Sequence, residues 1–201
     1  MVGKEYCLDA QGFRDSRNFF QPKEIGIYAV DDNIAPLVYL IKPPYHWSSM
    51  SEANQNHNKW IEYNHIGIPW SSGNLAYNRV KETLNNALCR ASVVYVRGEE
   101  KRKWLQSLIK PSVIEMVEVN LIDKKRRNIL CNNHTIHANF NCPFYIPTVC
   151  AVQNALAMKD YLIDFYHRRS IHSVIEAIEE DKENEERDEV DIPEHVLLMY
   201  N

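Results

Sequence analysis

Long apolar runs and an even set of cysteines are both missing from this sequence of 201 residues. No stretch of about 18 apolar residues is present, so we expect no transmembrane helix and no membrane partner. The first residues, Met1 to Tyr6, have no apolar segment of the kind that a signal peptide requires. Five cysteines are an odd number without a secreted disulfide pattern. These features predict an intracellular protein, nuclear or cytoplasmic.

Several common catalytic motifs are also missing. The sequence contains no Gly-rich phosphate loop, no Walker motif and no G-x-S-x-G motif. Apolar residues make up 45% of the chain and four tryptophans are present, which is typical of a packed domain. We therefore expect one folded domain over residues 1–170, followed by an acidic and flexible tail over residues 171–201.

Charge is divided unevenly along the chain. Residues 176–191 contain ten acids and two bases, a net charge of −8, whereas residues 1–175 carry 21 bases and 16 acids, a net +5. The tail is either a solvated extension or a segment that binds a partner or masks a basic face. A basic run in the domain is a candidate site for phosphates of single-stranded RNA, and its members are Lys124, Lys125, Arg126 and Arg127.

The apolar pattern predicts strands and helices in a definite order. Residues 6–13, 23–30 and 35–41 have strand character and are separated by turn residues, which favours a three-strand antiparallel meander. Further strands are expected at 92–97 and 113–119, and helices at 50–64, 75–89, 99–109 and from 151 onward. This order predicts an α/β, ribonuclease H-like mixed sheet flanked by helices.

A nuclease of that fold with the DEDD set of acids would hold two Mg²⁺ ions between converging carboxylates. Asp9, on the first strand, stands where the first metal-binding acid is expected. The other positions depart from the pattern: Gln11 replaces an acid, and Cys150 and Asn154 stand near the start of the last helix. We expect no DEDD mechanism. The alternative is a divergent Mg²⁺-dependent 3′–5′ exonuclease that uses Asp9, Glu24 and Glu99.

Soft metal ligands gather late in the sequence. Cys131 and His134 form a Cys-x-x-His pair, and Cys142 and Cys150 follow within 20 residues. Thiolate and imidazole groups at short spacing suit a tetrahedral structural zinc ion. The competing interpretation is that these are ordinary buried cysteines with a histidine in a loop. His57 and His65 have no evident catalytic partner in the sequence. The four tryptophans, Trp47, Trp60, Trp70 and Trp104, are expected to be packing residues.

Several segments, taken in order, resemble the Maelstrom-domain family, whose ribonuclease H-like fold has a Glu-Cys-His-Cys zinc site in place of the DEDD acids. They are residues 20–27, 64–69, 93–101, 131–134 and 150–151. The resemblance is to the short arthropod members that have no HMG box. It implies that Glu24, Cys131, His134 and Cys150 bind zinc, with Cys142 as the alternative to Cys150.

The same resemblance implies a function in RNA handling. It implies binding of single-stranded RNA or of protein partners in RNA silencing, and leaves weak, metal-independent cleavage of single-stranded RNA open. A third interpretation is a pure protein-interaction module that works through its acidic tail.

Overall fold

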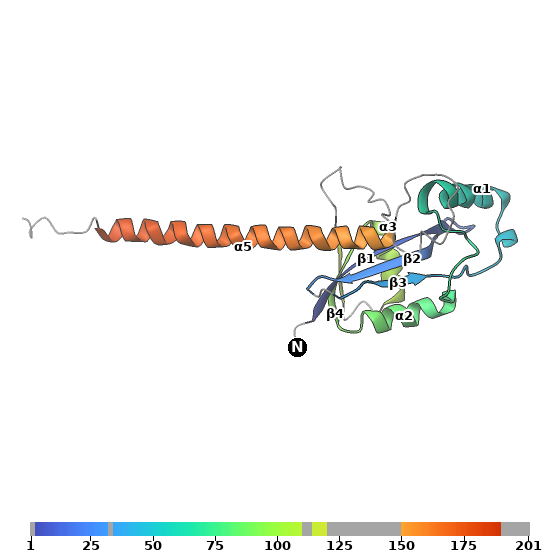
Figure 1. The fold of residues 1–201 in the computed structure, drawn as a ribbon, viewed down its shortest axis with the longest axis horizontal. Coiled ribbons are helices and arrows are strands. Elements are labelled where there is room, and N and C mark those ends of the chain that lie inside the picture. The colour runs from blue at the N-terminus through green and yellow to red at the C-terminus, as the bar shows by residue number, and fades with distance from the viewer. Residues whose placement is uncertain (1–2, 32–33, 110–113, 120–149, 190–201) are drawn as a thin grey trace, which may run out of the picture. The chain divides into compact units, whose positions relative to one another are not determined.

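A computed structural model describes residues 3–31, 34–109, 114–119 and 150–189 (Figure 1). The chain divides into two compact units, Met1–Tyr161 and Leu162–Asn201. The first unit contains the sheet and the start of the last helix, and the second contains the remainder of that helix. Among the described residues, no helix combines the length and the apolar character needed to cross a membrane.

One mixed sheet organises the first unit. Its strands are β1 (Lys4–Arg14), β2 (Phe20–Ala29), β3 (Leu37–Leu40), β4 (Ala91–Val96) and β5 (Glu115–Glu118). The spatial order is β3-β2-β1-β4-β5. β1, β2 and β3 pair antiparallel, and β4 and β5 join parallel on the other side of β1. The predicted mixed α/β architecture, with a meander of three strands, is confirmed.

Helices connect and cover the strands (Figure 1). They are α1 (Glu52–Ile61), α2 (Val80–Ala87), α3 (Glu99–Leu108) and α5 (Ala151–Glu189). The Ser51 side chain caps α1 by accepting a hydrogen bond from the Asn54 backbone. A π-helical turn, Glu62–Ile66, extends α1 and ends at Gly67, whose φ of 64° is easily adopted by glycine.

The main core lies between one face of the sheet and helices α2 and α3. Alternate residues of β1 and β2 supply Leu8, Ala10, Ile25 and Ile27, because successive strand residues point to opposite faces. The helices contribute apolar residues that include Leu84 and Leu105. A smaller cluster packs beneath α1 at the far end of β1 and comprises Phe13, Met50, Ile61, Ile66, Ile68 and Trp70.

The opposite face of the sheet is polar at its centre and is covered by the first turns of α5. Asp9 pairs with Gly26, and Gln11 pairs with Glu24, so these residues share that face. Gly26 permits the close approach of the helix, since a Cβ there would lie 2.6 Å from the Val152 Cα. The start of α5 therefore meets buried polar side chains instead of an apolar surface.

Helix α5 extends well beyond the apolar positions that predict it. The apolar residues that predict it lie between Ala151 and Phe165, whereas the helix continues to Glu189. No glycine or proline occurs between residues 151 and 189, and glutamate, lysine and arginine are good helix formers. Local propensity therefore favours helical backbone well past the last of those positions.

Candidate functional site

Asp9 is a fully buried carboxylate with side-chain partners from three elements of the described chain. Lys101, from α3, places its Nζ 2.5 Å from Asp9 Oδ1. The side-chain amides of Gln11 and Asn154 donate to Oδ2 over 2.7 and 2.8 Å. Three elements, β1, α3 and α5, thus converge on one side chain. A buried carboxylate needs such partners, because an unpaired charge away from water is very costly.

The charge of Asp9 is balanced by a side chain of the protein itself. The Lys101 ammonium provides the positive charge that a metal ion provides in a two-metal site. Gln11, at the position where a second acid was considered, donates a hydrogen bond to Asp9 instead of adding negative charge. The Asp9 carboxylate and the Lys101 ammonium therefore balance each other in charge.

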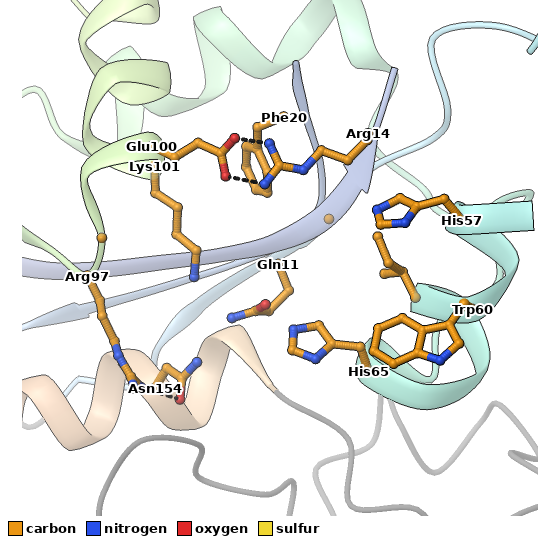
Figure 2. A pocket seen from close by; sticks show the side chains of 13 residues that line it. Gln11, Arg14, Phe20, His57, Trp60, His65, Arg97, Glu100, Lys101 and Asn154 are labelled. Carbon is orange, nitrogen blue, oxygen red and sulfur yellow. Dashed lines mark hydrogen bonds and ion pairs between the residues drawn. The ribbon is translucent and has the colours of Figure 1, made fainter. Parts of the chain in front are cut away.

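A cleft of about 540 Å³ is lined by the three side chains that contact Asp9, namely Gln11, Lys101 and Asn154. Figure 2 shows these three side chains at the cleft. Its walls come from the end of β1, the start of β2 and the two residues after β4, together with α1 and its π-helical extension, α3 and α5. The residues that line it are Gln11, Gly12, Arg14, Phe20, His57, Trp60, Ile61, His65, Arg97, Gly98, Glu100, Lys101 and Asn154. Three of these are Arg or Lys and one is Glu, so the lining carries a net positive charge. The cleft combines cations with aromatic rings.

Ion pairs and hydrogen bonds fix the cationic side chains of this cleft. Arg14 forms a bidentate pair with Glu100, with Nη2 2.8 Å from Oε2 (Figure 2). Arg97 Nη1 lies 3.4 Å from the Asn154 Oδ1, so Asn154 bridges Arg97 and Asp9. Such fixed guanidinium groups are well suited to phosphate oxygens.

Two histidines and a tryptophan form the opposite wall, on α1 and its π-helical extension (Figure 2). Burial, followed by the nearby Lys101 ammonium, lowers the pKa of His65, which favours the neutral imidazole at pH 7. Trp60 is 58% exposed. The expectation that Trp60 is a packing residue is therefore wrong: the polar side of α1 leaves its ring open to solvent at the cleft.

Glu24 and Cys150 meet on the same face of the sheet, away from Lys101. The Cys150 Sγ lies 3.8 Å from Glu24 Oε1, and both residues are fully buried. The Ala151 backbone N–H donates to Glu24 Oε2 over 2.8 Å, so this carboxylate also caps the start of α5. Two predicted zinc ligands that are far apart in the sequence are thus adjacent in space.

Other predicted site residues lie outside the described residues. These are the zinc-ligand candidates Cys131, His134 and Cys142, and the basic run Lys124, Lys125, Arg126 and Arg127. Within the described part of the chain, no group of three Asp, Glu, His or Cys side chains is placed to share a metal ion. The donor types present at Glu24 and Cys150, a carboxylate and a thiol, are both zinc ligands.

Glu99, the third acid of the exonuclease alternative, has partners of its own on α3. Arg102 donates to both of its oxygens over 2.7 Å, and Lys103 Nζ lies 3.4 Å away. The hydrogen bond from Arg102 lowers the pKa of Glu99 to about 2. Asp9, Glu24 and Glu99 are therefore each held by a different set of neighbours.

Sequence reasoning missed Lys101, Arg97 and Arg14 as residues of the cleft. Lys101 begins a short basic segment, residues 101–103, but its contact with Asp9 spans 92 residues. The usable signal was positional: Arg97 and Lys101 follow β4, and β4 is parallel to β1. Side chains at the carboxyl ends of adjacent parallel strands meet at one edge of a sheet.

Comparisons with known proteins add no assignment. No family model matches the chain, and no curated protein matches it significantly.

Proposed function

We propose that this chain is a ribonuclease H-like domain of the Maelstrom type that binds single-stranded RNA in the cleft beside Asp9 and does not use the two-Mg²⁺ mechanism. The strand order β3-β2-β1-β4-β5, with the first three strands antiparallel and the others parallel to β1, supports this assignment. The quoted sequence segments give the family resemblance.

The observation that carries the proposal is the contact of Asp9 with Lys101, Gln11 and Asn154. A catalytic carboxylate must keep oxygen lone pairs available to a metal ion. Here an ammonium and two amides already bind both oxygens of Asp9. A domain that keeps the cleft, and in which the protein's own side chains bind the central Asp9 carboxylate, is suited to binding RNA without cleaving it by the two-Mg²⁺ mechanism.

The composition of the cleft favours a single-stranded nucleic acid as the ligand. Proteins that bind single strands combine cations along the backbone path with exposed aromatic rings on which bases stack. Arg14, Arg97 and Lys101 line the cleft as cations, and Trp60 supplies an exposed ring. Arg14 pairs with Glu100 and Lys101 pairs with Asp9, so a phosphate would join these pairs or compete with their acids. Single-stranded RNA is preferred over a duplex because only unpaired bases can stack on a side chain.

We also propose that a structural zinc ion binds near Glu24 and Cys150. Glu24, Cys131, His134 and Cys150 would hold it, as the resemblance implies, and the contact of Glu24 with Cys150 fits that set. A zinc ion bound there would tie residues 131–134 to β2 and to the start of α5. Its role would be to stabilise the fold.

Binding of a fluorescent single-stranded oligoribonucleotide, measured by anisotropy, tests the function. We expect Trp60→Ala to weaken binding roughly tenfold, since a stacked base contributes about 1–3 kcal/mol. Tyr63→Ala is the matched control, because Tyr63 is also exposed but lines a different hollow. If both variants bind RNA as tightly as the unmodified protein does, the cleft is excluded as the RNA-binding site.

The basic run needs a separate test. Replacing Lys124, Lys125, Arg126 and Arg127 by Ala is expected to weaken RNA binding, and deleting residues 176–191 is expected to strengthen it, because the acidic segment competes for the same cations. Affinity should fall roughly tenfold between 50 and 200 mM salt if about two phosphates are contacted. If none of these changes affects RNA binding, the protein-interaction module becomes the better interpretation.

The exonuclease alternative predicts a different result. An Mg²⁺-dependent enzyme would shorten a labelled strand from its 3′ end, and Asp9→Asn would abolish this activity. We expect no Mg²⁺-dependent shortening. Any weak cleavage that persists in a chelator would agree with the metal-independent activity that the resemblance implies.

A further inference from the structure

His65 lies half-buried in the wall of the cleft, on the π-helical turn Glu62–Ile66 that follows α1 (Figure 2). Two hydrogen bonds hold this turn in place. The Gly67 backbone N–H donates to the Glu62 carbonyl over 2.9 Å, and Glu62 Oε2 accepts the Trp70 backbone N–H over 2.8 Å. Such turns are rare in proteins and occur often at functional sites. The backbone that carries the His65 imidazole at the cleft is therefore well fixed.

Two of the cations that line the cleft have carboxylate partners within the protein. Arg14 pairs with Glu100, and Lys101 pairs with Asp9. Each pair has no net charge, so a phosphate that enters the cleft gains less from it than from a cation without an acid beside it. One further positive charge would increase the attraction, and a protonated imidazole at His65 would supply that charge.

In the free protein, the surroundings of His65 oppose its protonation. Burial, and then the Lys101 ammonium, lower the pKa of His65 below its ordinary value of 6.5, whereas the Asp9 carboxylate raises it in part. The charged or titratable side chains that line the cleft with His65 are Arg14, His57, Arg97, Glu100 and Lys101. A phosphate in this cleft acts in the same direction as Asp9, because a nearby negative charge favours the imidazolium form. Binding of a phosphate and binding of a proton should therefore favour each other.

We propose that binding of single-stranded RNA in the cleft is accompanied by uptake of a proton at His65, and that the imidazolium contacts a phosphate of the strand. This inference rests on the RNA site proposed above. The complex holds more protons than the free protein, so RNA affinity rises as the pH falls below neutrality. If binding raises the pKa of His65 by about one unit, the affinity increases by at most about tenfold.

Calorimetric titration of the full chain with an oligouridylate tests the proposal. A strand without a terminal phosphate is suitable, since uracil and phosphodiester groups neither gain nor lose a proton between about pH 5.5 and 7.5. Titration in two buffers with different ionisation enthalpies counts the protons that are taken up. We expect up to one proton per bound strand, and an affinity that increases by up to about tenfold from the upper to the lower end of this pH range.

Two variants of His65 separate its charge from its shape. His65→Gln has no group that can be protonated, so it should bind weakly at every pH and take up fewer protons. His65→Arg is always charged, so it should bind tightly over the whole range. His46→Gln is the matched control and should behave as the unmodified protein does, because His46 is exposed and is not among the residues that line the cleft. Thermal unfolding checks that each variant is folded.

Three outcomes would overturn the proposal. Equal proton uptake by His65→Gln and by the unmodified protein would assign the proton to another group, and its loss in His57→Gln would identify the other histidine of this wall. RNA affinity that depends on Trp60 but not on pH would contradict the role of His65 and leave the RNA site in place. If Trp60→Ala binds RNA as tightly as the unmodified protein, the RNA site is wrong and the role of His65 is wrong with it.

Discussion

Asp9 and Glu24 are two fully buried carboxylates on adjacent strands and on the same face of the sheet, and their surroundings differ. Asp9 is bound by an ammonium and two amides. Glu24 accepts a backbone N–H and lies beside the thiol of Cys150. The described contacts of Asp9 include a protein cation, and those of Glu24 include a thiol, which is a second side chain of a metal-ligand type.

The comparison teaches where a metal ion is expected in this fold. A cation that competes for Asp9 has to displace Lys101, which α3 holds in place. A cation at Glu24 and Cys150 would gain a carboxylate and a thiolate, which is a zinc-like donor set. The difference between the sites arises from two residue choices: a lysine on α3 and a cysteine at the start of α5.

The largest effect on stability is expected from variants that remove the proposed zinc ligands around Glu24. Protein purified without chelator should contain one zinc ion per chain by elemental analysis, and Cys150→Ser or Cys131→Ser should lose it. Loss of a structural zinc should lower the free energy of unfolding by at least about 3 kcal/mol, or the melting temperature by about 10 °C.

Two further variants make the zinc prediction specific. Cys89→Ser is the matched control, because Cys89 is exposed and lies outside the site. Cys142→Ser separates the two candidates for the last ligand, and we expect it to retain zinc. If Cys150→Ser keeps its zinc and Cys142→Ser loses it, Cys142 is the zinc ligand and Cys150 is not. Absence of zinc from the unmodified protein would contradict the proposed zinc site.

Removal of the Asp9 carboxylate should have the next largest effect on stability. Asp9→Asn leaves the Lys101 ammonium, whose side chain is 19% exposed, without its counter-charge. Removal of one partner from a buried ion pair typically lowers stability by about 3 kcal/mol. Urea unfolding should show this loss, and Asp9→Asn/Lys101→Met should recover part of it.

The control for Asp9 is another carboxylate–cation pair of the same cleft. Glu100→Gln breaks the pair with Arg14, in which both side chains are substantially exposed, so its cost should stay below about 1 kcal/mol. Stabilisation of the unmodified protein by Mg²⁺, lost in Asp9→Asn, would show instead that Asp9 binds a metal ion.

The order of strands and helices could be predicted from the sequence because it depends on local signals. Alternating apolar residues mark β2, and Pro43 and Pro44 lie beyond the end of β3. Asp9 could be identified as a site candidate because its place on the first strand is fixed by that order. The mixed α/β class and the buried acid beside the cleft could thus be predicted from the sequence.

The rest depends on contacts between distant segments. Lys101 approaches Asp9 only because β4 lies beside β1, and sequence spacing does not reveal the direction of its side chain. The sequence does not reveal that Gly26 lies against α5, where a Cβ atom would be 2.6 Å from the Val152 Cα. The exposure of Trp60 follows from how α1 packs, which its own apolar residues do not determine.

The smallest expected effect concerns a buried cation without a paired acid. Lys23 is 2% exposed, and its Nζ donates to the carbonyls of Ile41, Trp70 and Ser72. Burial lowers the pKa of Lys23 to about 7, although Glu62 raises it in part. Lys101, by contrast, has the Asp9 carboxylate as a direct partner. Comparison of Lys23 with Lys101 therefore distinguishes the effect of burial on a lysine from the effect of an ion pair.

The lowered pKa of Lys23 makes stability depend on pH in a defined direction. Above about pH 7 the folded chain releases the Lys23 proton, whereas the unfolded chain keeps it until about pH 10.5. The unfolded state then binds more protons, so the free energy of unfolding should rise with pH, by at most about 1.4 kcal/mol per unit. Urea unfolding between pH 7 and 8.5 measures this slope, and Lys23→Met should reduce it. An equal slope in both proteins would mean that the carbonyls hold Lys23 in its protonated form throughout that range.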